Sequence, residues 1–119
     1  FGAKEGYEVL KGIIDSDEGS KRLGEIALIP YHSPINELKT LFYNTLYDEN
    51  ASCHMALGIG FSDCIKGGID MDKKELFEKG VNDSLVHVDF MMGTEDLMID
   101  GILEDGSHVK IFENGNFVF

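Results

Sequence analysis

The chain has 119 residues, of which 43% are hydrophobic, so it is long enough for one domain with its own core and too apolar for a disordered segment. Its 22 acidic and 10 basic residues give a net charge of −12, which argues against nucleic acid and anionic membrane surfaces as partners. No apolar run approaches the roughly 18–20 residues that a membrane span requires.

The first half of the sequence predicts two helices separated by a strand. Apolar residues recur at helical spacing over residues 5–14. The segment Gly24–Pro30 is typical of a buried strand, opened by Glu25 and stopped by the proline. Ser33 and Pro34 are preferred N-cap and first-turn residues. They predict a helix from Pro34 to about Tyr47, with inward-facing Ile35, Leu38, Leu41, Phe42 and Leu46.

The second half predicts one short helix and several strands. A polar connection over 48–54 leads into a short apolar segment over 55–58 and then a glycine-containing loop. A capping box predicts a helix over 72–79 that ends at Gly80, and 84–90 reads as a strand. Segments 96–103, 109–112 and 117–119 are joined by Asp-Gly and Asn-Gly, which favour tight hairpin turns. We therefore predict an α+β fold: a single mixed domain of a buried sheet with short helices and a C-terminal antiparallel β-meander.

Two further features bear on the cellular compartment of the protein and on the extent of the chain. Cys53 and Cys64 do not make a disulfide framework, and we expect reduced thiols in a cytoplasmic protein. The first residues lack an initiator Met and the apolar core of a signal peptide, so we expect a piece of a longer protein.

Carboxylates and imidazoles of the predicted strands and connections are candidate metal ligands. His87 and Asp89 alternate along one strand and share a face, whereas the plain alternative is a pair of surface polar neighbours. Glu25 opens a strand, and Glu49 and His54 flank a connection; each has a solvated or structural alternative. Such a mixture suits Zn²⁺, Mn²⁺ or Co²⁺ better than Ca²⁺, and it exceeds the needs of one structural zinc. A pair of divalent ions fits it.

Several blocks resemble the carboxyl-terminal part of the aminopeptidase T/aminopeptidase S/PepS family of dinuclear metalloaminopeptidases. The resemblance covers nearly the whole chain, in order and with consistent spacing. The blocks are 22–30 (Arg-Leu-Gly-Glu-Ile-Ala-Leu-Ile-Pro), 33–35 (Ser-Pro-Ile), 49–58 (Glu-Asn-Ala-Ser-Cys-His-Met-Ala-Leu-Gly), 84–93 (Ser-Leu-Val-His-Val-Asp-Phe-Met-Met-Gly), 99–101 (Ile-Asp-Gly) and 114–117 (Asn-Gly-Asn-Phe).

The resemblance implies a role for each matched residue. Glu25 matches a glutamate that can bridge two metals, and Glu49, His54, His87 and Asp89 match the other ligands. It implies two divalent ions (Zn²⁺, Co²⁺, Mn²⁺ or Mg²⁺), a peptide substrate that loses its amino-terminal residue, and a homodimer, with 117–119 as a candidate contact. One metal would polarise the scissile carbonyl, and a carboxylate would carry a proton to the leaving amine.

Two departures from the family pattern qualify the expected activity. Phe61 stands where the family usually has a tyrosine assigned to the active site. Family members also have an amino-terminal domain and an upstream glutamate ligand that this chain lacks, so we expect residues 1–119 to be its C-terminal metal-binding domain, inactive alone. The alternative is a dimerisation or interaction module of a divergent, catalytically impaired homologue.

Overall fold

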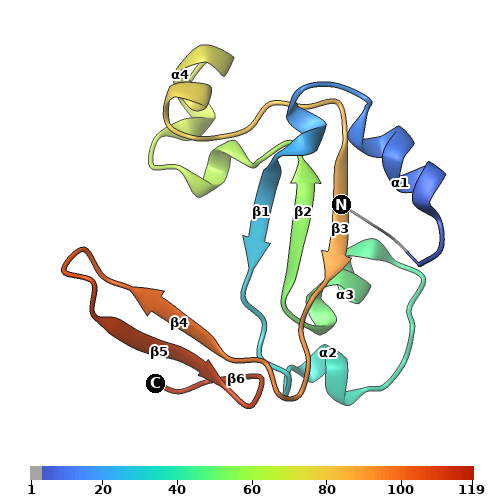
Figure 1. Ribbon diagram of the computed structural model, residues 1–119, viewed down its shortest axis with the longest axis vertical. Helices are drawn as coiled ribbons and strands as arrows, with labels where there is room; N and C mark the ends of the chain where they lie inside the picture. Colours follow the sequence, from blue (N-terminus) through green and yellow to red (C-terminus); the bar gives the residue numbers. More distant parts are fainter. Residues whose placement is uncertain (1–3) are drawn as a thin grey trace. The chain divides into compact units, whose positions relative to one another are not determined.

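The computed structural model describes residues 4–119, and within them it has short helices and two three-stranded sheets (Figure 1). The predicted α+β class is confirmed. The chain forms two compact units, each built from two separate segments. The first unit comprises residues up to Ile26 together with Met55–Phe90, and the second comprises Ala27–His54 together with Met91–Phe119.

The sheet of the first unit has the order β1-β2-β3. Its strands are β1 (Leu23–Ala27), β2 (His54–Gly58) and β3 (His87–Met91), and the central strand runs opposite to its two neighbours (Figure 1). The predicted strand over 24–30 is corrected in two respects. It ends at Ala27, and it is an edge strand whose Ile26 side chain is 61% exposed. The buried strand is β2, which has a neighbour on both sides.

The helices of this unit are short and follow the sequence signals. They are α1 (Tyr7–Ile14) and α4 (Lys73–Glu78), with 3-10 turns η1 (Gly19–Lys21), η3 (Ser62–Cys64) and η4 (Gly68–Asp70). The predicted capping box is confirmed: Asp72 accepts from the N–H of Glu75, and the Glu75 carboxylate accepts from the N–H of Asp72. Gly80 follows α4 with a φ of 91°, a conformation that favours glycine.

The helix predicted over 34–47 is wrong. The structure has one turn, α2 (Pro34–Glu37), and then an irregular segment before α3 (Thr45–Asp48) and η2 (Glu49–Ala51). The Ser33 hydroxyl caps α2 as expected, accepting from the N–H of Asn36. The physical reason for the break lies at Asp48, whose carboxylate accepts from the N–H groups of Phe42 and Asn44. A side-chain acceptor of this kind offers the backbone an alternative to helical hydrogen bonds.

Apolar residues expected to face inward from that helix are instead exposed. Leu38, Leu41 and Leu46 are each more than 60% exposed. Lys39 and Tyr43 have positive φ values of 48° and 55°, which no α-helix contains. Helical spacing of apolar residues therefore did not fix a helix here, because short helices depend on a packed face for most of their stability.

The meander predicted for the C-terminal part is confirmed in the second unit. Its strands are β4 (Ile99–Ile102), β5 (His108–Glu113) and β6 (Asn116–Phe117), paired antiparallel in chain order. The Asn114-Gly115 turn has two positive φ values, 50° and 71°, as a tight hairpin requires. Phe112 is fully buried, and its ring centroid lies 4.3 Å from that of Phe117.

The two cysteines are free thiols: Cys53 is buried and Cys64 is exposed. Cys53 is held inside the second unit, where its Sγ accepts from the N–H of Ile29 and donates to the Ile29 carbonyl. Among residues 4–119 no helix has the length and apolarity that crossing a bilayer demands.

Candidate metal centre

Glu25, His87 and Asp89 come together on the sheet of the first unit. The Nε2 atom of His87 lies 3.2 Å from a carboxylate oxygen of Glu25 and 3.4 Å from one of Asp89. One potential ligand atom from each residue lies within 4.8 Å of the other two. Glu25 belongs to β1 and the other two to β3, so the side chains meet across the central strand, a span of about 9.5 Å between strand axes. We call these three residues the carboxylate–imidazole cluster.

The backbone fixes the orientation of the His87 ring. The Nδ1 atom of His87 lies 2.8 Å from the carbonyl oxygen of Ile59. A carbonyl oxygen only accepts hydrogen bonds, so Nδ1 must carry a proton and donate it. In the neutral ring Nε2 then holds the lone pair and points at the two carboxylates. A second-layer hydrogen bond of this kind is what orients most metal-binding histidines.

The cluster has more acceptors than donors, which is the arrangement that a cation resolves. The Oδ1 atom of Asp89 is buried and makes no hydrogen bond, although His87 Nε2 lies 3.4 Å away. A buried carboxylate oxygen without a donor is costly. A divalent metal would satisfy all three groups at once, and imidazole with carboxylates is a common ligand set. The residues present therefore fit such an ion.

Hydrogen bonds from outside the cluster fix where β3 begins. The carboxylate of Asp17 accepts from the N–H of Leu85 at 2.7 Å and from the hydroxyl of Ser84 at 3.0 Å. It also accepts from the N–H of Ser20 at 2.8 Å. These bonds, led by the one from Leu85, hold the pKa of Asp17 below its usual value. They join the turn after α1 to the residues just before His87 and so set the register of the strand.

Close backbone contacts hold the same end of the sheet together, where β2 ends beside the start of β3. The buried side chain of Asn82 donates to the carbonyls of Gly19 and Gly58, at 2.8 and 2.6 Å. Gly58 has a φ of 107°, and a Cβ atom there would lie 1.9 Å from the carbonyl oxygen of Val86. The N–H of Ile59 donates to that same Val86 carbonyl. The Ile59 carbonyl that orients His87 is therefore fixed on both sides.

A pocket of about 300 Å³ adjoins the cluster and shares Glu25 with it. Phe61 lines this pocket as well, and its ring centroid lies 4.9 Å from that of His87. The aromatic ring thus covers one side of the imidazole, and its para position carries no hydroxyl. The arrangement places a hollow surface directly beside the candidate ligands.

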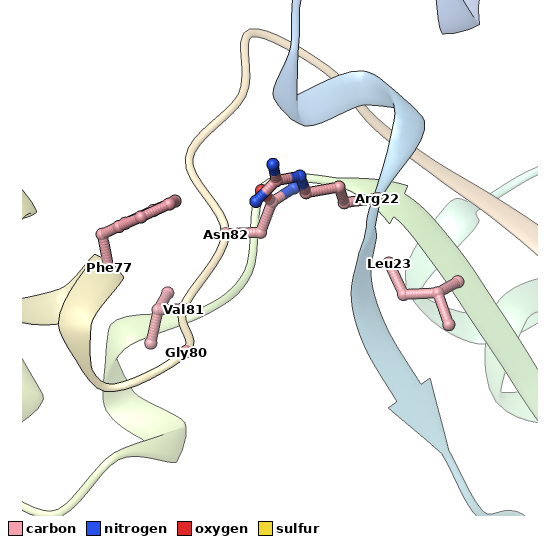
Figure 2. A pocket seen from close by; sticks show the side chains of 6 residues that line it. All are labelled: Arg22, Leu23, Phe77, Gly80, Val81 and Asn82. Atoms are coloured by element: carbon pink, nitrogen blue, oxygen red, sulfur yellow. The ribbon is translucent and has the colours of Figure 1, made fainter.

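A second pocket, of about 160 Å³, lies next to the first and shares Gly80 and Val81 with it. Figure 2 shows Phe77 and Val81 on one side of it and Leu23 on the other, with the side chains of Arg22 and Asn82 between them. None of the cluster residues lines it. We therefore place the candidate chemistry at the larger pocket.

Glu49 and His54, the two remaining predicted ligands, belong to the second unit. Glu49 begins the turn η2, and His54 is the first residue of β2 and is 1% exposed. The Nδ1 atom of His54 lies 3.0 Å from the carbonyl oxygen of Ser52, so this ring too has its Nε2 atom as the candidate ligand atom. The metal-binding roles of these two residues stay predictions.

Sequence reasoning missed the parts of the site that depend on tertiary contacts. The Ile59 carbonyl is a backbone group, and no side-chain pattern marks it. Asp17 and Asn82 lie 68 and 24 residues from groups that they bind. Cys64 lines the pocket, whereas the sequence indicates only a reduced thiol at this position. Glu25 and Phe61, which line the same pocket, did carry sequence signals: Glu25 opens an apolar segment, and Phe61 departs from the family pattern.

Comparisons with known proteins match nearly the whole chain, including the residues of the cluster. The family described as thermophilic metalloprotease (M29) matches residues 1–117. "Aminopeptidase 2" of Geobacillus stearothermophilus is 53% identical over 119 residues, which are 100% of this chain and 29% of that protein. "Aminopeptidase T" of Thermus aquaticus is 44% identical over 117 residues, 98% of this chain and 28% of that protein. A solved structure, wild-type AmpT from Thermus thermophilus, matches with a TM-score of 0.86 and 41% identity over 98% of this chain and 28% of that one. The chain thus spans less than a third of the length of these relatives.

Proposed function

Because the chain belongs to the thermophilic metalloprotease (M29) family, we propose that it is the metal-ligating C-terminal part of an aminopeptidase. The relatives bear the name aminopeptidase, which confirms the family resemblance stated from the sequence. The proposed reaction is hydrolysis of the amino-terminal residue from a peptide. The family description implies divalent metal ions; their number, two, is part of the proposal.

One observation carries the proposal: the carboxylate–imidazole cluster lies at a pocket and has an unsatisfied buried acceptor. Glu25, His87 and Asp89 are 25%, 21% and 17% exposed, so a small molecule can reach them while much of their surface is shielded from water. A buried carboxylate oxygen without a hydrogen-bond donor, as Asp89 Oδ1 is, is uncommon in folded proteins unless it binds something. Glu25 connects the cluster to a space that can hold part of a substrate.

The proposed chemistry divides between the ion and the chain's own residues. A bound divalent cation would supply Lewis-acid activation of the scissile carbonyl and of the attacking water. Asp89 and His87 would hold it, His87 being fixed by the Ile59 carbonyl. Glu25 would have two tasks, ligation and proton transfer, because its carboxylate reaches both the cluster and the pocket. A carboxylate at that position can accept a proton from water and return it to the leaving amine.

Glu49 and His54 complete the proposed ligand set for two ions. His54 is buried with its Nδ1 atom bonded to a backbone carbonyl, the same orientation device that His87 uses. Imidazole and carboxylate ligands accommodate Zn²⁺, Co²⁺, Mn²⁺ and Mg²⁺ to different degrees. Because the relatives are more than three times longer, residues 1–119 alone should bind metal weakly and hydrolyse little peptide.

We further propose a cytoplasmic homodimer for the whole protein. Phe119 is 91% exposed, and Val118 beside it is 44% exposed, which favours a covering partner. A second candidate function follows from the same residues: the domain mainly supports dimerisation, and its ligand residues are vestigial. Metal content separates the two, since a metal-free protein that still dimerises fits only the second.

The test compares the full-length protein that contains this chain with its Glu25→Gln variant. Metal content is measured by atomic spectroscopy, and turnover is measured on leucine p-nitroanilide. We expect about two metal ions per chain in the wild type, and in the variant weaker metal binding with a loss of turnover of at least about 10²-fold. Glu18→Gln, an exposed carboxylate paired only with Lys21 at 3.2 Å, is the matched control. Wild-type protein without bound metal or turnover would contradict the proposal.

A further inference from the structure

The pocket beside the cluster is lined mainly by apolar side chains. Apart from Glu25 and backbone-only glycines, it is lined by Ile26, Phe61, Cys64, Ile65 and Val81. Glu25 is the one charged residue among the lining residues, and it already faces His87. An anionic guest would meet the like charge of Glu25, and a cationic guest would have as its counter-charge only a carboxylate already engaged with His87, whereas an apolar guest would bury apolar surface.

The position of the pocket decides which part of a substrate reaches it. In an aminopeptidase the reacting carbonyl belongs to the amino-terminal residue, whose Cα is about 1.5 Å from the carbonyl carbon. The side chain of that residue must therefore enter space that adjoins the metal ligands. The pocket is such a space, because Glu25 contributes to its wall and to the cluster. Its volume of about 300 Å³ is at the low end for small-molecule sites, which suits one side chain and not a length of peptide.

We propose that this pocket receives the side chain of the substrate's amino-terminal residue and selects apolar side chains of about the size of leucine. Ile65 and Cys64 are then specificity-determining residues, because they line the pocket without belonging to the cluster. The inference rests on the proposed aminopeptidase function. The smaller neighbouring pocket has Arg22 in its lining and no cluster residue, so it is not the space next to the reacting carbonyl.

The first test is a specificity ratio measured in the full-length protein. Ile65→Phe fills the pocket, and we expect it to lower the ratio of kcat/KM for leucine p-nitroanilide to kcat/KM for alanine p-nitroanilide by about tenfold. Ile69→Phe is the matched control, because Ile69 is 77% exposed and does not line the pocket. Its ratio should equal that of the wild type. An unchanged ratio in Ile65→Phe would overturn the proposal, and because it is a ratio, a general loss of activity does not imitate the effect.

The second test needs no turnover and uses the exposed thiol. Iodoacetamide should alkylate Cys64, and the rate is followed by mass spectrometry of the peptide that contains it; Cys53 is buried and serves as an internal reference. We expect leucinamide to slow alkylation of Cys64 several-fold and glycinamide to leave it unchanged. Equal rates with both amides would contradict the assignment of the pocket. If leucinamide protects Cys64 in a protein that hydrolyses no peptide, the pocket does bind apolar side chains, and it is the proposed aminopeptidase function that is overturned.

Discussion

Phe61 places an unsubstituted ring against the imidazole of His87, with 4.9 Å between the ring centroids. The family resemblance predicts a tyrosine at this position in related sequences. We propose that a hydroxyl there would donate to the reacting carbonyl oxygen, on which negative charge develops. Loss of one such donor typically slows turnover by about 10²-fold. The proposed aminopeptidase should accordingly be slow for its family.

Phe61→Tyr in the full-length protein should raise kcat by up to about 10²-fold and leave metal content unchanged. Steady-state hydrolysis of leucine p-nitroanilide measures the effect. Phe77→Tyr is the control, because Phe77 lines the smaller pocket and not the larger one. If Phe61→Tyr turns over no faster than the wild type, the hydroxyl has no part in this reaction.

Gly58 and Gly12 offer the same substitution with opposite expected effects. A Cβ atom at Gly58 would collide with the Val86 carbonyl at 1.9 Å, and the φ of 107° disfavours any other residue. Gly12 lies inside α1 with open space around it. Gly58→Ala should therefore lower the free energy of unfolding by more than about 2 kcal/mol, and Gly12→Ala should raise it by about 0.5–1 kcal/mol. Urea unfolding measures both, and equal effects would show that the β2–β3 contact is not tight.

At the scale of elements, the connection from α1 to β3 depends on one carboxylate. Asp17 accepts hydrogen bonds from Leu85, Ser20 and Ser84, and these lower its pKa in the folded state. A lowered folded-state pKa means that the carboxylate stabilises the fold at pH values above its unfolded pKa, about 3.9. That contribution is lost as the pH falls through the folded-state pKa.

Asp17→Asn should lower the urea midpoint at pH 7, and the gap to the wild type should narrow as the pH falls below about 4. The variant keeps the size of the side chain and loses the charge, so the narrowing reports the titration of Asp17 itself. Glu18→Gln should change the midpoint little at either pH, because exposed pairs contribute little. A gap that stays constant down to pH 2 would contradict the role given to this carboxylate.

The elements that the sequence predicted well are those with a local cause. The capping box of α4 and the Asn114-Gly115 turn involve neighbouring residues only, so the local sequence predicts them correctly. The helix expected over 34–47 failed because its apolar spacing needed a covering face, and the Asp48 carboxylate bonds the backbone of the intervening segment instead. The sequence predicted that β1 would extend to Pro30, whereas it ends at Ala27. The reason is similar, because an apolar run does not specify how far a strand pairs with its neighbour.

The candidate site was predictable in part, for equally specific reasons. The alternation of His87 and Asp89 followed from strand geometry, and Glu25 was singled out as a carboxylate in an apolar segment. What brings Glu25 to them is the order β1-β2-β3, which residue spacing does not encode. The lining of the pocket by Cys64, Ile65 and Val81 depends on two loops meeting, and no local pattern marks it.

At the scale of the whole molecule, several large apolar side chains are exposed in the part of the chain that the structure describes. Leu38, Leu41 and Tyr43 in the second unit are exposed by 62%, 61% and 91%. The relatives that match are more than three times as long, so further chain or a second copy is the natural cover for such surfaces. We therefore propose that the activity resides in the full-length protein that contains this chain.

The negative charge of the molecule bears on whether the cluster binds a metal ion. The chain has a net charge of −12, and the cluster includes two of its carboxylates beside one imidazole. Without a cation these groups oppose one another, whereas with a cation they become ligands. Removing one carboxylate should therefore lower the stability of the folded protein when metal is present, and should not lower it when metal is absent.

The most direct test is the thermal unfolding midpoint of the full-length protein and its Asp89→Asn variant, each measured with excess chelator and with added Zn²⁺ or Co²⁺. We expect metal to raise the wild-type midpoint by mass action and to raise that of the variant much less. In chelator the variant should be at least as stable as the wild type, because the amide can donate where Asp89 Oδ1 has no partner. Asp70→Asn, an exposed carboxylate of the same unit, should match the wild type in both conditions. A variant that is destabilised equally with and without metal would contradict a metal centre at Glu25, His87 and Asp89.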